Sequence, residues 1–447
     1  MRVTAEWRVY ALGAALCVAL TICSRNFSDR GGPYFMAALT FAGIAYLFAV
    51  LEFFRGRGAR APQRFPRRVV VFGLIMAAVW HIEFLRLPAG ADDDIHRYVW
   101  DGRLQRLGYN PYLVIPGDPA AKELHTAETR NLNNPDLASP YPPGAELFFR
   151  AVTAVHESTL AMKVAFVICD FAIVVVLLDV LRGSGQGAHL VLAFAWNPLL
   201  AIEVAGSGHI DIVGALLLVV SAAALARRWR TTAAVALGLA IAVKFLPIVL
   251  LPLYWRRIRI RDAALAAVVV ALLYLPFLSH GRIPMGSLGT YVQTFRFNGP
   301  VFAALARVAP PQLLVGLAVL AGLLTAILFR RASTRRAPLR AAVADWSPDL
   351  YAWPLAASLL FAPAVFPWYL LWLLPFLTST STLLIVVWTV SIIATYVQWH
   401  LRALGRPWGA LPGWIMLVEY GCVAIAAMII VLRRTAQSTD PDAQQSI

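Results

Sequence analysis

The sequence predicts an all-α polytopic membrane protein, and three observations support this prediction. Hydrophobic residues make up 60% of the 447 residues, whereas charged residues make up only 14%. Apolar runs of about 17 to 25 residues, the length that crosses a ~30 Å hydrocarbon core, recur from end to end. The ten-residue alternation typical of a membrane β-barrel is not visible. Arginine clusters separate the apolar runs, as expected for loops between membrane helices.

The arginine clusters also predict the orientation of the chain. They lie at positions 55–68, 227–230, 256–261, 330–340 and 433–434. Basic loops remain on the cytoplasmic side of a membrane, so we expect both termini to be cytoplasmic. The formal net charge of +15 is then explained by orientation and by anionic lipid headgroups, and no nucleic-acid partner is predicted.

The order of apolar runs predicts about thirteen membrane crossings. We expect these spans, in chain order, at Arg8–Ser24, Pro33–Phe54, Val69–Leu87, Thr159–Leu181, Ala188–Val204, Ile210–Ala226, Thr231–Trp255, Ala263–Leu278, Leu313–Phe329, Leu350–Val365, Trp368–Leu377, Leu383–Trp399 and Leu411–Leu432. The segment Thr231–Trp255 is basic at both ends and contains Lys244 and two prolines, so it is interpreted as a broken hairpin.

The domain organisation follows from these spans. Residues 1–435 are expected to form a single transmembrane domain, and residues 436–447 a disordered cytoplasmic tail. Residues 88–157 form the longest non-spanning region, which is too long for a mere connector and is therefore a candidate catalytic loop with short interfacial helices. Residues 279–310 form a second outer loop.

Three consecutive aspartates, Asp92, Asp93 and Asp94, stand out in the first outer loop because acidic residues are scarce in this chain. A helix starting at Asp94 would place Asp94, Arg97, Tyr98, Asp101 and Gln105 on one face. Trp100, Leu104 and Leu107 would fall on a neighbouring face, which suits contact with a membrane surface or a protein wall. Helix capping explains one of the acids well but three poorly. A carboxylate next to other acids has a raised proton affinity, which suits a general base acting on a hydroxyl group.

Several other polar residues are candidates for binding an anionic or sugar ligand. Lys244 lies in the broken hairpin without an acid nearby in sequence. His209 follows the Gly206-Ser207-Gly208 turn and is either functional or only a solvated loop histidine. Arg296, between two phenylalanines, is either a stacked structural arginine or an anion ligand. Trp368 and Tyr369 offer aromatic faces for a sugar or an isoprenoid chain, or belong to an interfacial aromatic belt. Lys163 shares a helix face with Asp170, seven residues later, and is interpreted as snorkelling to the interface or pairing with Asp170 rather than as functional.

Two motifs in the first outer loop carry a family resemblance: Asp93-Asp-Ile-His-Arg-Tyr-Val-Trp-Asp-Gly-Arg103, and the Gly108-Tyr-Asn-Pro-Tyr112 turn. They resemble the first outer loop of GT-C superfamily glycosyltransferases, in particular bacterial polyprenyl-phosphate-mannose-dependent α-mannosyltransferases. Further stretches that agree are Ser139–Gly144, Trp196–Leu200, Gly208–Asp211, Lys244–Pro247 and Pro367–Tyr369.

The resemblance implies a GT-C-like bundle and an inverting enzyme of the bacterial inner membrane, with its active site on the periplasmic side. A hexose, by resemblance mannose, would move from a polyprenyl-phosphate donor to a lipid-linked or polysaccharide acceptor. The family pattern places the catalytic base at Asp94, with Asp93 second. Arg97, His209, Lys244, Arg296, Trp368 and Tyr369 are the candidates for binding the donor phosphate or sugar.

Two positions depart from the family pattern. His96 stands where a tyrosine is usual, and Phe366 stands where a histidine usually precedes Pro-Trp-Tyr. No cofactor is predicted to be required and no metal ligand is assigned, although an aspartate run next to His96 leaves a divalent metal open. The rival interpretation, a secondary transporter or flippase of lipid-linked sugars, predicts mid-membrane ionisable residues and repeated halves. No repeat is visible here.

Overall fold

The computed structural model describes residues 2–55, 65–90, 93–283, 285–336, 346–409 and 411–439. Three predicted features lie partly or wholly outside the described residues. They are Asp92, a part of the arginine cluster at 55–68, and the end of the predicted tail at 440–447. Residues 436–439, predicted as part of the disordered tail, instead form the last turn of a long helix.

The fold is entirely helical in the described part of the chain, where the only β-type pairing is two isolated bridges. The α-helices are α1 (Arg2–Arg25), α2 (Pro33–Phe54), α3 (Arg67–Leu85), α4 (Ile95–Arg106), α5 (Pro143–Val155), α6 (Thr159–Gly183), α7 (Leu192–Ala195), α8 (Asp211–Ala226), α9 (Arg230–Val243), α10 (Leu251–Tyr254), α11 (Ile260–Tyr274), α12 (Leu288–Thr294), α13 (Pro300–Leu305), α14 (Pro311–Arg336), α15 (Asp349–Leu360), α16 (Leu383–Ser391), α17 (Val397–Ala403) and α18 (Gly413–Thr439).

Short helical segments of other types connect these helices. They are η1 (Phe27–Asp29), η2 (Pro119–Leu124), η3 (Ala188–Val191), η4 (Leu200–Gly206), η5 (Leu246–Leu250), η6 (Leu275–Phe277), η7 (Pro367–Trp372), η8 (Leu374–Phe376), η9 (Thr380–Thr382) and η10 (Ile392–Tyr396). Helices α2, α5 and α14 each begin on a proline, whose fixed φ and missing N–H suit the first helical position.

Multi-pass membrane architecture is supported by helix length. Eight helical stretches in the described residues are long and apolar enough to cross a membrane, or nine if one bent pair counts as a span. The predicted spans at α1, α2, α3, α6, α11, α14 and α18 are single long helices. The remaining predicted spans are short, as in α8, α9 and α15, or built from several pieces, as at 367–377. The count of thirteen crossings stays a prediction.

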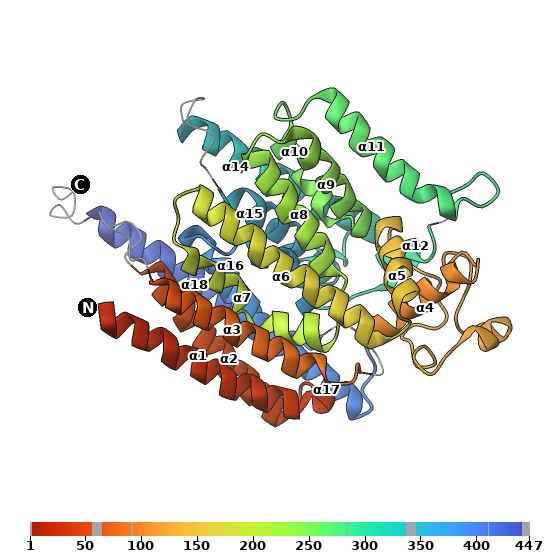
Figure 1. Ribbon diagram of the computed structural model, residues 1–447, viewed down its shortest axis with the longest axis horizontal. Coiled ribbons are helices and arrows are strands. Elements are labelled where there is room, and N and C mark those ends of the chain that lie inside the picture. The colour runs from red at the N-terminus through yellow and green to blue at the C-terminus, as the bar shows by residue number, and fades with distance from the viewer. Residues whose placement is uncertain are drawn as a thin grey trace.

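The bundle has two different ends (Figure 1). Helices α4, α5 and α12 lie at one end, whereas the described N- and C-terminal ends of the chain lie at the other. The two predicted outer loops touch each other at the first end, where Ser287 Oγ donates to the Ala138 carbonyl at 2.6 Å. The first loop also contacts the end of the predicted span that precedes the second loop, since Asn110 Nδ2 donates to the Phe277 carbonyl at 2.8 Å. Residues 88–157 and 279–310 therefore form one cap over this end.

Helix α4 is buried on both of the faces that the sequence distinguishes. Arg97, Tyr98, Asp101 and Gln105 are all buried, as the one-face prediction implies. Trp100 and Leu104 pack with Ala121 and Leu132 of the same loop. Their face therefore contacts a protein wall rather than a membrane surface.

Two chain breaks position the polar residues of this end. The segment Ala188–Gly206 bends by 65° at the Trp196-Asn197-Pro198 sequence, where the Asn197 side chain accepts from the Leu199 amide at 3.0 Å. The bent second half carries Glu203 and leads to His209. Helix α9 ends at Val243 because Lys244 is extended (φ −159°) and Pro247 follows, which is incompatible with a continuous helix. The predicted break at Lys244 is thus present.

Of the two structural interpretations of Lys163, the one that pairs it with Asp170 is wrong. Asp170 Oδ2 lies 2.8 Å from His81 Nε2, and both side chains are buried. Lys163 Nζ instead donates to the carbonyls of Phe84, at 3.4 Å, and Leu87, at 2.8 Å. The prediction failed because residues on one helix face can each find a nearer partner on the neighbouring α3.

Candidate active site

Of the two aspartates of the run that the structure describes, Asp94 has the more accessible carboxylate. Asp94 occupies the residue before α4, but its side chain makes no capping hydrogen bond. Asn133 Nδ2 donates to its Oδ1 at 2.6 Å, and its Oδ2 lies 3.9 Å from His209 Nδ1. The side chain is 24% exposed. A carboxylate that is held in place by one hydrogen bond and is partly exposed is suited to accept a proton.

The neighbouring Asp93 is engaged in the architecture of the site. Its side chain is only 5% exposed, and Arg30 Nη2 donates to its Oδ1 at 2.8 Å. The Gly90 amide donates to its other oxygen at 2.7 Å. Arg30 also donates to Ser207 Oγ at 2.6 Å. Through these bonds Arg30 and Asp93 join three connections at the outer end of the bundle. Both carboxylate oxygens of Asp93 accept hydrogen bonds, so neither is free to serve as a base.

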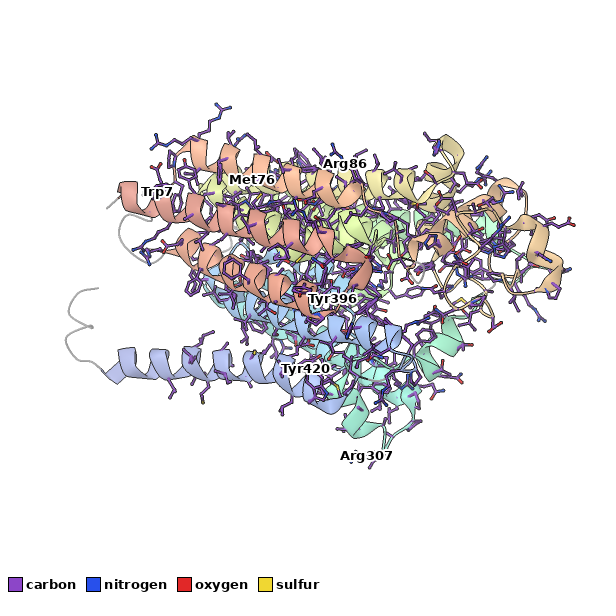
Figure 2. The ribbon with its side chains drawn as sticks, turned by 90° about the horizontal axis from the view of Figure 1, so that it is seen from below. Trp7, Met76, Arg86, Arg307, Tyr396 and Tyr420 are labelled. Atoms are coloured by element: carbon purple, nitrogen blue, oxygen red, sulfur yellow. The ribbon has the colours of Figure 1, made fainter. Side chains whose placement is uncertain are left out.

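His209 lies between the Asp94 carboxylate and the buried acid Glu203. Its Nε2 lies 3.0 Å from Glu203 Oε2, and the Tyr396 hydroxyl donates to the other Glu203 oxygen. Gly208 precedes it with φ +76°, where a Cβ would lie 2.5 Å from the Ile95 side chain. Burial alone would lower the pKa of His209, but the Glu203 carboxylate raises it above the ordinary value. Figure 2 shows Tyr396 inside the bundle, between the N-terminal and C-terminal helices.

The rings of Trp368 and Tyr369 contact the cationic residues His209 and Lys244. One face of Trp368 stacks on His209, with ring centroids 4.0 Å apart, and the other stacks on Phe366 at 4.5 Å. The Lys244 ammonium lies 3.7 Å from the Tyr369 ring centroid. Phe366, which replaces the usual histidine, therefore completes a stack that holds His209 in place.

Lys244 and Arg97 both find partners at this end of the bundle. Lys244 Nζ donates to Asp211 Oδ1 at 2.6 Å, and Trp372 Nε1 donates to the same oxygen at 2.7 Å. Arg97 Nη2 donates to the carbonyl of Asn134 at 2.8 Å and to that of Asn133 at 3.2 Å. Arg97 thus fixes the turn that presents Asn133 to Asp94, and the acid missing near Lys244 in sequence is supplied by Asp211.

Arg296 has a local structural environment. Its guanidinium donates to the carbonyls of Val292, Gln293 and Phe295, at 2.6–3.3 Å, and lies over the Phe302 ring. These carbonyls belong to the C-terminal turn of α12, where a cation also complements the helix dipole. Of the two interpretations that the sequence left open, the structure favours the structural arginine.

Three tyrosines near Asp94 were not predicted to form part of the site as a group. Burial, followed by the Asp94 charge, raises the pKa of Tyr98, Tyr141 and Tyr291. Their hydroxyls therefore stay protonated; Tyr98 is fully buried, whereas Tyr141 and Tyr291 are partly exposed. Tyr141 belongs to the Ser-Pro-Tyr-Pro-Pro-Gly stretch, which was a usable signal. Arg30, Asn133 and Tyr291 carry no motif and lie far from Asp94 in sequence.

A metal site is not evident from the ligand types. Within the described residues, no group of three or more His, Cys, Asp or Glu side chains is placed to hold a metal ion. The imidazole of His96, considered as a ligand, is engaged by the carbonyls of Glu128 at 2.6 Å and Gly90 at 3.0 Å.

A pair of buried acidic residues, Asp101 of α4 and Glu146 of α5, lies beneath the site. Glu146 accepts from Gln105 Nε2 at 2.9 Å and from Ser139 Oγ. Burial raises the pKa of Asp101 to about 7, although the Arg97 charge opposes the shift. Burial and the Asp101 charge raise the pKa of Glu146 as well. The pair therefore retains protons that free carboxyl groups would lose.

This pair predicts a pH-dependent stability. Because Asp101 is protonated in the folded protein up to about pH 7 but ionises near pH 3.8 when unfolded, its contribution is present at low pH and is lost as the pH rises between these values. Thermal unfolding in detergent should show a midpoint that falls from pH 5 to pH 8. Asp101→Asn should reduce this slope, whereas the exposed Asp136→Asn should not. Parallel slopes for wild type and Asp101→Asn would contradict the buried-acid assignment.

The fold and the site together define a class. An all-helical membrane bundle with a partly exposed carboxylate in its first long loop agrees with the GT-C resemblance that the motifs of that loop had indicated. A family model described as alpha-(1->6)-mannopyranosyltransferase, N-terminal domain (the MptA_B family) matches residues 10–258, more than half of the chain. The chain belongs to this family and is a mannosyltransferase of the GT-C type.

The matched region contains much of the site. It includes Asp93, Asp94, Arg97, His209 and Lys244, whereas Arg296, Trp368 and Tyr369 lie beyond it. No curated protein and no solved structure matches the chain.

Proposed function

We propose that the enzyme transfers mannose, with inversion, from a polyprenyl-phosphate donor to a lipid-linked or polysaccharide acceptor on the outer face of the membrane. Asp94 is the catalytic base. The observation that carries this proposal is the state of its carboxylate: positioned by Asn133, not used in helix capping, and partly exposed next to His209. Among the three consecutive aspartates, Asp93 is committed to Arg30.

The proposed reaction is a single displacement. The Asp94 carboxylate takes the proton of an acceptor hydroxyl as its oxygen forms a bond to the anomeric carbon of mannose. The bond from that carbon to the phosphate oxygen breaks at the same time, and polyprenyl phosphate leaves with the electron pair. Attack opposite the leaving group inverts the anomeric configuration. Asp94 then returns its proton to water.

Negative charge develops on the leaving phosphate, so the site needs a positioned cation. His209, which Glu203 helps to keep protonated, and Lys244, whose side chain is 25% exposed, are the proposed phosphate ligands. Arg97 and Trp368 act as positioning residues for Asn133 and His209. Tyr141 and Tyr291, which are partly exposed, are proposed to donate hydrogen bonds to mannose or to the acceptor, and the buried Tyr98 supports them.

The outer-face location is supported by the asymmetry of the bundle. Asp94 lies at the end that carries α4, α5 and α12 (Figure 1). The arginine-rich connections at 227–230 and 256–261, which the positive-inside rule assigns to the cytoplasm, join helices at the other end. A donor carried by a long isoprenoid lipid would reach such a site from within the bilayer.

The role of Glu203 predicts a change in the pH profile of transfer. Glu203 raises the pKa of His209, so the imidazolium is present below that pKa and is lost as the pH rises through it. Glu203→Gln should move the alkaline limb of kcat/KM to lower pH, and His209→Gln should lower kcat by about 100-fold. Glu123→Gln, an exposed change in the first outer loop, should leave both unchanged. An unshifted alkaline limb in Glu203→Gln would contradict the role of His209 as a cation.

The proposal as a whole is tested by supplying the purified protein with radiolabelled polyprenyl-phosphate mannose and membrane acceptors. Mannosylated acceptor is expected. Failure of the wild type to use any polyprenyl-phosphate sugar would overturn the donor assignment.

A further inference from the structure

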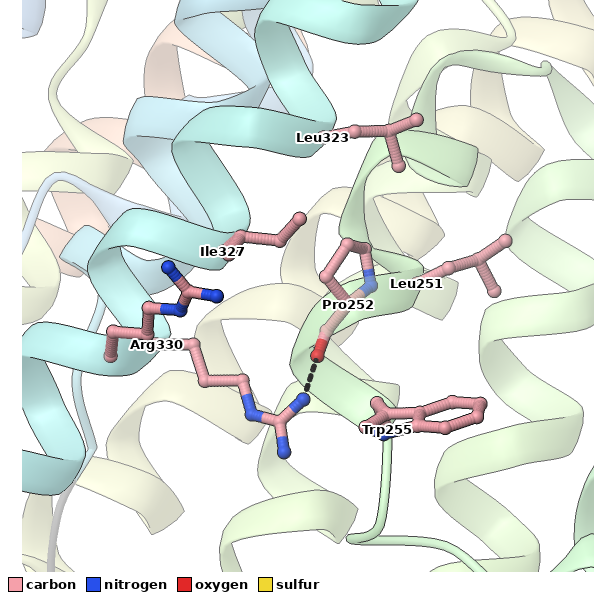
Figure 3. A pocket seen from close by; sticks show the side chains of 7 residues that line it. Leu251, Pro252, Trp255, Leu323, Ile327 and Arg330 are labelled. Carbon is pink, nitrogen blue, oxygen red and sulfur yellow. Dashed lines mark hydrogen bonds between the residues drawn. The ribbon is translucent and has the colours of Figure 1, made fainter.

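A groove lies far from Asp94, between α14 and the segment formed by η5 and α10. It has a volume of about 580 Å³, and its walls include Leu251, Trp255, Leu323, Ile327, Arg330 and Arg331. Figure 3 shows the apolar side chains on both walls and Arg330 donating to the Pro252 carbonyl, at 2.8 Å. The C-terminal half of α14 extends toward the end of the bundle that holds the two chain termini (Figure 1).

The two segments that form the groove are rich in arginine, and the acid that directly follows the first of them, Asp262, lies 3.9 Å from Arg261. The segments Leu246–Arg261 and Pro311–Arg336 contain eight arginines and no acidic residue: Arg256, Arg257, Arg259, Arg261, Arg330, Arg331, Arg335 and Arg336. Arg256 and Arg257 are close enough to act electrostatically on Arg330. Among the described residues, none of these three has a carboxylate within 4 Å. Clustered guanidinium groups without a counter-charge favour an anionic ligand.

The rest of the groove is suited to hydrocarbon. Leu251 is 47% exposed and Trp255 is 68% exposed. On the outside of α14, Leu320, Leu324 and Leu328 are exposed as well. Tryptophan is enriched at the level of lipid headgroups, and arginine next to an apolar span pairs with anionic headgroups. The wall therefore changes from cationic to apolar along the groove, as an amphipathic lipid requires.

We propose that this groove binds an anionic glycerophospholipid. Its phosphate contacts Arg330 and Arg331 within the field of Arg256 and Arg257, and an acyl chain lies along Leu251, Leu323 and Ile327. The lipid is a bound structural ligand that joins α14 to α10. It is not the reacting lipid, because the Asp94 site lies at the opposite end of the bundle. The inference is therefore independent of the proposed donor and acceptor.

The test is lipid binding to the purified full-length protein in detergent, measured by native mass spectrometry and by thermal unfolding. Phosphatidylglycerol should bind and raise the unfolding temperature, whereas phosphatidylcholine and inorganic phosphate should not. Arg330→Gln/Arg331→Gln should weaken phosphatidylglycerol binding by about tenfold or more. Arg282→Gln/Arg307→Gln removes the same charge elsewhere and should bind like the wild type; Figure 2 places Arg307 away from the end that carries the termini.

A second variant covers the case in which loss of the Arg330–Pro252 hydrogen bond prevents folding. Arg256→Gln/Arg257→Gln leaves that bond in place and should also weaken phosphatidylglycerol binding. Unchanged binding in the groove variants would overturn the site. Equal binding of phosphatidylcholine would show that the groove does not distinguish lipids by headgroup charge, which would contradict an anionic ligand. Tighter arginine-dependent binding of polyprenyl phosphate, or competition by inorganic phosphate, would overturn the assignment to a glycerophospholipid.

Discussion

Asp94→Asn is expected to lower kcat for mannosyl transfer by about 10²–10⁴-fold, the contribution of a positioned general base. The amide cannot accept the hydroxyl proton, but its oxygen can still accept the hydrogen bond from Asn133 Nδ2. Because the Asp94 side chain makes no capping bond and is 24% exposed, folding should be unaffected. Transfer of radiolabelled mannose and thermal unfolding, measured on the same preparation, separate the two effects.

Asp136→Asn is the matched control for this experiment. It makes the same chemical change at an exposed position of the same loop, and it should retain wild-type activity. A folded Asp94→Asn protein that transfers mannose within about threefold of the wild-type rate would remove Asp94 from the role of base.

Asp93→Asn is expected to destabilise the protein by roughly 3–5 kcal/mol, the usual effect of removing one partner of a buried ion pair. The side chains of Arg30 and Asp93 are 8% and 5% exposed. In the variant, the charge on Arg30 would therefore have neither water nor a carboxylate next to it. Arg30 also holds Ser207, close to His209, so activity should fall together with stability. Thermal and denaturant unfolding in detergent measure the change.

The double variant Arg30→Gln/Asp93→Asn tests whether the ion pair is the cause. Because it removes both charges, it should recover a substantial part of the lost stability. The opposite pattern, a stable but inactive Asp93→Asn protein next to an active Asp94→Asn protein, would transfer the role of base to Asp93.

The different roles of Asp93 and Asp94 show how far sequence reasoning reaches. Apolar periodicity and arginine placement predict the helical membrane bundle, and motif resemblance leads to the correct family. Adjacent aspartates differ only in their surroundings. Asp93 pairs with Arg30 and Asp94 with Asn133, and both partners are far away in the chain. Lys244 illustrates the same point, since Asp211 and Tyr369 reach it from two other segments.

Aromatic residues were harder to interpret from sequence. Trp368 and Tyr369 were considered as sugar-stacking faces, yet both faces of Trp368 are covered by His209 and Phe366, and Lys244 covers Tyr369. The substitution at Phe366 makes sense only in three dimensions, because its ring extends the stack that orients His209. The number of crossings was equally inaccessible, since bends such as the 65° break near Asn197 divide apolar runs without changing their composition.

The most direct test of the account is the stereochemistry of transfer by the wild-type enzyme reconstituted in liposomes. Polyprenyl-phosphate mannose of one anomeric configuration is supplied with an acceptor, and the new linkage is assigned by NMR. The account predicts label transfer with inverted configuration, lost in Asp94→Asn. A product that retains the configuration of the donor would contradict the single displacement, and transfer only from a nucleotide-activated mannose would contradict the proposed donor.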